Sequence, residues 1–164
     1  MPETRIRTRL TRGAALVASV LGLVAIAAPA SADLTLNNDQ VLAVRQAVMR
    51  TNSAFNGLVG AQAKGQITIP PDQLKAIGEA WLRYGKLAPA LFPAGSGMDK
   101  NPKSKAKPEI WSDAAGFKTK LDAYAKATSD FQAAASKGDA GPVKTATEEV
   151  GKACQGCHET YRAR

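Results

Sequence analysis

The chain has 164 residues, with 22 Lys and Arg side chains against 14 Asp and Glu, so its formal net charge is +8. Much of this excess lies in residues 1–32, which hold four arginines and one glutamate. A basic head, an uncharged apolar stretch over residues 13–32 and the ending Ala30-Ser31-Ala32 are typical of a cleaved secretory signal peptide. We therefore expect residues 1–32 to be removed and residues 33–164 to form the mature domain.

The composition of residues 33–164 excludes several classes of protein. These 132 residues carry 18 basic and 13 acidic side chains, because the first segment removes four arginines and one glutamate, and their net charge is +5. This length fits one compact domain, and no second apolar run is long enough to span a membrane. The charge is too small and too dispersed to favour nucleic-acid binding, and it fits transient docking to acidic partner proteins better. A retained N-terminal anchor is the alternative to export, but Ser19, Gly22 and Pro29 interrupt its apolar run.

Apolar residues recur one helical turn apart in four segments, at about 38–64, 71–87, 112–137 and 139–162. Between the second and third segments, residues 88–108 are rich in proline, glycine and lysine, which predicts a long surface loop. The sequence therefore predicts an all-α fold, an antiparallel four-helix bundle with one long crossover loop between helices 2 and 3.

The motif Cys154-Gln155-Gly156-Cys157-His158 contains both cysteines and the only histidine of the chain. The spacing C-x-x-C-H is the attachment signature of c-type haem. Two thiols one helical turn apart can each form a thioether with a haem vinyl group, and the adjacent histidine can then bind the iron. Cys154 and Cys157 are therefore predicted haem attachment sites, and His158 is the predicted proximal iron ligand.

Three other interpretations of this motif are less favoured. A thioredoxin-like dithiol belongs at the start of a helix that follows a strand, and this motif lies near the end of a helix. A structural zinc site needs about four ligands, of which the motif supplies three. A plain disulfide is compatible with export but gives the histidine no role.

The second iron ligand is less constrained by the sequence. Because His158 is unique, a second histidine of the same chain cannot provide it. Met98 lies in the predicted loop, whereas Met49 lies in the first helix and can either bind the iron or simply fill space in the core. Spacing alone leaves both roles of Met49 open.

Five segments spread across the mature chain carry a family resemblance: Val44-Arg45-Gln46-x-x-Met49, Leu91-Phe92-Pro93-x-Gly95-Ser96, Lys107-Pro108-Glu109-Ile110-Trp111-Ser112, Gly138-Asp139 and Cys154-x-x-Cys157-His158-x-x-Tyr161-Arg162. With these segments the sequence resembles class II cytochromes c, the cytochrome c-prime superfamily, and most closely its low-spin, methionine-ligated branch. The resemblance implies that Met49 is the distal iron ligand, that Arg45 lies near a haem propionate and that Arg162 lies near the proximal histidine. Four aromatic residues are further candidates for packing near the haem: Trp81, Trp111, Phe117 and Tyr124.

These observations predict a periplasmic monohaem cytochrome that carries one electron through His158–Fe–Met49, with haem c as its cofactor and unidentified redox proteins as partners. We expect no enzymatic activity, because the single histidine is committed to iron. Lysines of the crossover loop are candidates for steering an acidic partner, and the bundle can be a monomer or a homodimer. The alternative is a five-coordinate, high-spin cytochrome that binds nitric oxide or carbon monoxide.

Overall fold

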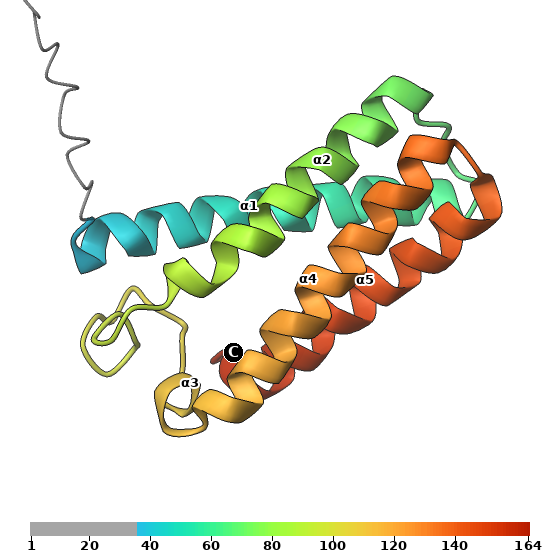
Figure 1. Ribbon diagram of the computed structural model, residues 1–164. Coiled ribbons are helices and arrows are strands. Elements are labelled where there is room, and N and C mark those ends of the chain that lie inside the picture. Colours follow the sequence, from blue (N-terminus) through green and yellow to red (C-terminus); the bar gives the residue numbers. More distant parts are fainter. Residues whose placement is uncertain (1–35) are drawn as a thin grey trace, which may run out of the picture. The chain divides into compact units, whose positions relative to one another are not determined.

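A computed structural model describes residues 36–164 of the chain, and the predicted signal peptide lies outside these residues. The described residues form five α-helices and one 3-10 helix. The helices are α1 (Asn38–Ala63), α2 (Pro71–Leu87), η1 (Ala88–Leu91), α3 (Glu109–Ser112), α4 (Ala114–Lys137) and α5 (Ala140–Tyr161). The predicted all-α four-helix bundle is confirmed, with α1, α2, α4 and α5 as its long helices (Figure 1).

Local signals in the sequence account for the helix boundaries. The Asn37 side chain accepts a hydrogen bond from the backbone N–H of Gln40, whose own side chain accepts one from the Asn37 N–H, and this capping box starts α1. Pro71 occupies the first position of α2, where its missing N–H costs nothing. Gly138 ends α4 in the left-handed conformation, at φ 75°.

The main core lies where α2 and α5 both pack against α4. Trp81 of α2 and Phe131 of α4 are fully buried, and their rings meet edge to face with centroids 4.7 Å apart. Gly85 lets α2 approach α4 closely, because a Cβ atom there would lie 2.7 Å from Thr128 Oγ1. α1 packs against α5 and α2, and completes the bundle.

A second, smaller core lies at the end of the bundle where the crossover loop meets the C-terminal residues (Figure 1). It is built from Ala106, Ile110, Phe117 and Tyr161. The backbone of Lys105 and Lys107 is tied to the residues after α5, since Ala163 N–H donates to Lys105 C=O and Lys107 N–H donates to Tyr161 C=O. The crossover loop is therefore fastened directly beside the end of α5.

The predicted surface position of residues 88–108 is wrong for part of this segment. Ser96 and Ser104 are among the most deeply buried residues, at 1% and 2% exposure. Both accept hydrogen bonds from Arg45 of α1, and this buried guanidinium draws the loop against the bundle. Composition alone misses this arrangement, because the loop's polar residues pair with a cation from a distant helix.

Candidate functional site

The candidate site is a cavity of about 530 Å³ at the end of the bundle that carries the second core. One face of α1, the crossover loop, the start of α4 and the last turn of α5 line it. This volume is in the range of cofactor pockets. The cavity therefore brings together α1, the first long helix in the sequence, and the end of α5, the last one.

The last turns of α5 form the wall that carries the C-x-x-C-H motif. Cys157 and His158 line the cavity, while Cys154, one turn earlier, is half-buried and packs against the main core. Both cysteines are free thiols, and burial raises the pKa of each. Since they are not paired with each other in a disulfide, both are available for thioether formation.

His158 is exposed toward the cavity, and its backbone carbonyl accepts the N–H of Arg162 at 3.3 Å. Partial burial and then the positive charge of Arg162 lower the pKa of His158. A lowered pKa favours the neutral imidazole, which is the form that binds a metal. Arg162 itself is exposed and lines the same cavity as His158, and its role beside the haem stays a prediction.

α1 supplies the second wall through residues one turn apart. Leu42, Gln46, Met49 and Ser53 follow the i, i+4, i+7, i+11 spacing of one helix face and all line the cavity. Met49 is half-buried there, whereas Met98 is 43% exposed on the crossover loop and does not line the cavity. Of the two candidate methionines, only Met49 therefore shares the cavity with His158.

Arg45 lines the same cavity, but its guanidinium is engaged by the crossover loop. Its two terminal nitrogens donate to the carbonyl oxygens of Leu91 and Ser96 and to the hydroxyls of Ser96 and Ser104, at 2.7–3.1 Å. Burial lowers its pKa, and no carboxylate within the described residues pairs with it. The guanidinium also lies 4.9 Å from the centre of the Phe92 ring. A contact between Arg45 and a haem propionate stays a prediction.

Aromatic side chains form a third wall. The rings of Phe92, Phe117 and Tyr161 line the cavity and stack edge to face in series, with centroids 5.0 and 5.2 Å apart. The Tyr161 hydroxyl donates to Asp113 Oδ2 at 2.6 Å, which fixes the end of the series. These rings provide an apolar, rigid surface against which a flat macrocycle can pack.

The four candidate aromatic residues lie at different distances from the cavity. Phe117 lines the cavity, and the Trp111 indole N–H donates to the Phe92 carbonyl behind it. Trp81 and Tyr124 do not line the cavity. Trp81 belongs to the main core, and the Tyr124 hydroxyl accepts a hydrogen bond from the buried side-chain amide of Asn52 in α1. Phe92 was missed as a site residue, although it lies within one of the segments that carry the resemblance.

The residues around the cavity fit haem c. Two free thiols one turn apart and an adjacent imidazole match covalent attachment and iron ligation, and a thioether faces the same space from α1. Apolar rings suit the macrocycle, and four cationic side chains suit its two propionates. No residue that lines the cavity is chemically incompatible with haem c.

Comparison with known proteins identifies the family. Residues 40–162 match the family model described as "Cytochrome C'". The chain belongs to the cytochrome c' family. Cytochrome c' of Rubrivivax gelatinosus is 36% identical over 119 residues, which cover 72% of this chain and 90% of that protein. Cytochrome c-556 of Rhodopseudomonas palustris is 34% identical over 152 residues, which cover 90% of this chain and 94% of that protein.

Solved structures of cytochromes c' share the fold. A nitric oxide complex of a variant cytochrome c prime from Alcaligenes xylosoxidans superposes with a TM-score of 0.71 at 31% identity, covering 79% of this chain and 98% of that one. As a cytochrome c' family member, the chain is a monohaem protein with covalently attached haem c. No helix among residues 36–164 is long and apolar enough to cross a membrane.

Proposed function

We propose that this protein is a periplasmic one-electron carrier whose haem iron is bound by His158 on one side and Met49 on the other. Cys154 and Cys157 hold the haem through thioether bonds. When bound, the haem iron supplies the one-electron couple. His158 would bind the iron through its imidazole and Met49 through its thioether sulfur, and methionine as a partner to histidine raises the potential of a haem.

The observation that carries this proposal is the shared cavity of Met49 and His158. The two side chains reach it from different helices, α1 and α5, which pack against each other. A macrocycle attached to α5 through Cys154 and Cys157 would lie between them. The α1 backbone around Met49 is helical on both sides, so the thioether is presented from a rigid element.

The lining of the cavity gives no support to acid–base catalysis. It contains no Asp or Glu side chain, and its single histidine is assigned to iron. General acid–base chemistry would need such a group within hydrogen-bond reach of a substrate. We therefore propose electron transfer and no catalytic residue.

A second candidate function is gas binding at a five-coordinate iron, and the comparisons favour it. Relatives of this chain are named cytochrome c', and one solved structure with the same fold is a nitric oxide complex of that protein. This function requires that Met49 packs beside the haem without binding the iron. Whether Met49 binds the iron therefore separates the two functions.

Replacing Met49 tests the proposal. The Met49→Ala holoprotein is expected to change from a low-spin to a high-spin spectrum and to bind carbon monoxide when reduced. Met98→Leu, the matched control on the exposed loop, should keep the wild-type spectrum. If wild type and Met49→Ala both give high-spin spectra and both bind carbon monoxide, the gas-binding function replaces the electron carrier.

Covalent attachment of the haem is tested independently of Met49. Cys154→Ser combined with Cys157→Ser should release the haem into organic solvent after acid denaturation, whereas wild type keeps it. Retention of the haem by the double variant would contradict attachment through these thiols.

A further inference from the structure

We propose that the rim of the haem cavity is the docking surface for an acidic face of a partner redox protein, an inference that rests on the proposed electron-carrier function. The surface consists of Arg50 from α1, Lys105 from the crossover loop and Arg162 from the end of α5; we call it the cationic rim. All three residues line the cavity and are exposed. Three segments distant in sequence thus place a positive charge around one opening.

The charges of the cationic rim are not neutralised by neighbouring carboxylates. Within residues 36–164, the side chains of Arg50 and Arg162 form no ion pair and no hydrogen bond, and Lys105 Nζ donates only to the carbonyl oxygen of Arg164. No acidic side chain lines the cavity. Arg50 and Arg162 therefore present unpaired positive charge to solvent.

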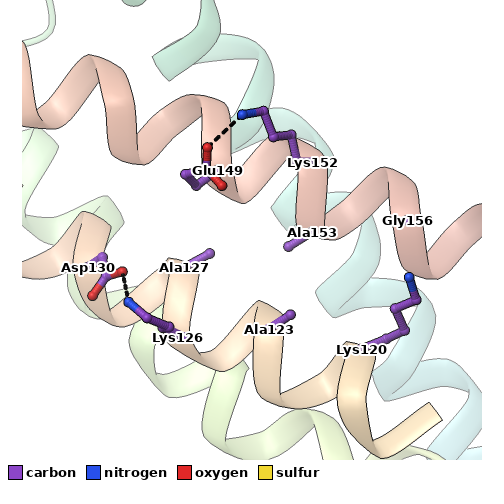
Figure 2. A pocket seen from close by; sticks show the side chains of 9 residues that line it. All are labelled: Lys120, Ala123, Lys126, Ala127, Asp130, Glu149, Lys152, Ala153 and Gly156. Carbon is purple, nitrogen blue, oxygen red and sulfur yellow. Dashed lines mark hydrogen bonds and ion pairs between the residues drawn. The ribbon is translucent and has the colours of Figure 1, made fainter. Parts of the chain in front are cut away.

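On the outer face of α4 and α5, by contrast, lysines are paired with neighbouring carboxylates, which provides a comparison within the same molecule. Figure 2 shows a groove there, with a floor of alanines and with lysines paired to acids along its sides. Lys126 Nζ lies 2.6 Å from Asp130 Oδ2, and Lys152 Nζ lies 2.7 Å from Glu149 Oε1 (Figure 2). Two of the three lysines that line this groove are thus paired with acids, and the third is Lys120, whereas no acidic side chain lines the haem cavity.

Haem binding would reduce this positive charge but not remove it. A haem brings two propionate carboxylates, and four cations line the cavity, the three of the rim and the buried Arg45. Because Arg45 is buried, the three cations of the rim exceed the two propionates by one positive charge. At physiological ionic strength such charges act over roughly 8 Å, which is enough to steer a partner that approaches the opening.

The geometry of the rim favours a protein over a small anion. A small anion is held by donors that converge on one point, whereas these three side chains come from three separate elements and extend into solvent. A broad acidic surface can meet all three at once. It would also approach the haem where the cavity opens, and electron transfer is fastest over the shortest distance. Surface complementarity of this kind mainly accelerates association.

Charge reversal on matched faces tests the proposal. Arg50→Glu combined with Lys105→Glu is compared with Lys118→Glu combined with Lys126→Glu, which makes the same change in net charge on the outer face of α4. Stopped-flow oxidation of the reduced holoproteins is measured with hexacyanoferrate(III), with the cation tris(phenanthroline)cobalt(III) and with an acidic blue-copper protein, at ionic strengths from low to high. Visible spectra of both variants are recorded first; a spectrum of the rim variant that differs from wild type would place Arg50 and Lys105 at the haem and overturn their assignment to docking.

At low ionic strength, the rim variant should react at least about tenfold more slowly than wild type with hexacyanoferrate(III) and with the acidic protein, and faster with the cobalt cation. The control variant should stay within about twofold of wild type with all three, and high salt should remove the differences. Equal slowing of both variants would show that net charge alone acts, and would overturn the proposal. Slowing with hexacyanoferrate(III) but not with the acidic protein would overturn the assignment to a protein partner. Because each variant is compared with wild type, which has the same iron ligands, the ratios of these rates are independent of the spectroscopic test of Met49.

Discussion

The replacement of Arg45 by methionine is predicted to loosen the crossover loop and destabilise the whole domain. Arg45 is 5% exposed and donates four hydrogen bonds, to Leu91, to Ser104 and twice to Ser96. These bonds hold the polar part of the loop against α1. Methionine keeps most of the aliphatic volume but donates none of them.

The size of the effect follows from two opposing contributions. A hydrogen bond from a charged donor stabilises by about 1.5–3 kcal/mol, so four of them would contribute roughly 6–12 kcal/mol if they were independent. Burying a cation without a carboxylate partner costs several kcal/mol, and the methionine variant avoids this cost. We therefore expect a net loss of about 3 kcal/mol, which is a large part of the 5–15 kcal/mol stability of a typical domain.

Denaturant unfolding of the holoprotein measures this loss, and amide hydrogen exchange locates it. The Met98 N–H, bonded to the Ala106 carbonyl, and the Ser104 N–H, bonded to the Asn101 carbonyl, should lose protection first. Arg83→Met is the matched control, because Arg83 is exposed on α2. If Arg45→Met unfolds at the same denaturant concentration as the control and its loop amides exchange at wild-type rates, the reasoning is refuted.

Two further changes test the packing and the helix caps. Gly85→Ala should destabilise the domain by about 1–3 kcal/mol in thermal unfolding, because its Cβ would lie 2.7 Å from Thr128 Oγ1. Gly60→Ala is the control: free space surrounds that position, so the change should be neutral or stabilising by up to about 1 kcal/mol. Asp113→Asn should lower stability at pH 7, because hydrogen bonds from Tyr161 and then from a backbone N–H lower the pKa of Asp113. That stabilisation is complete above the ordinary carboxyl pKa of about 4 and is lost as the pH falls through the lowered value, so the difference should shrink at pH 3; an equal difference at both pH values would contradict it.

The sequence predicts the long helices well because their signals are local. The capping residues Asn37 and Asp113, the proline at the start of α2 and Gly138 after α4 are all visible in the sequence. The C-x-x-C-H motif also carries its chemistry within five consecutive residues. The observed bounds of the long helices accordingly differ from the predicted ones by a residue or two at most.

The interior of the crossover loop could not be predicted in the same way. Its burial depends on hydrogen bonds between Arg45 and residues 46 to 59 positions later, and no local pattern records these partners. The cationic rim is hidden for the same reason, since it joins side chains from α1, the loop and the end of α5. Gln46 and Ser53, however, share the helix face of Met49, so helical spacing could have indicated them.

The visible absorption spectrum of the wild-type holoprotein, recorded oxidised and reduced and with and without carbon monoxide, tests the central claim most directly. Ligation by His158 and Met49 predicts a low-spin spectrum in both states, a weak far-red band in the oxidised form and no change on addition of carbon monoxide. A high-spin spectrum that shifts with carbon monoxide would contradict the claim, and would show that Met49 only packs beside the haem.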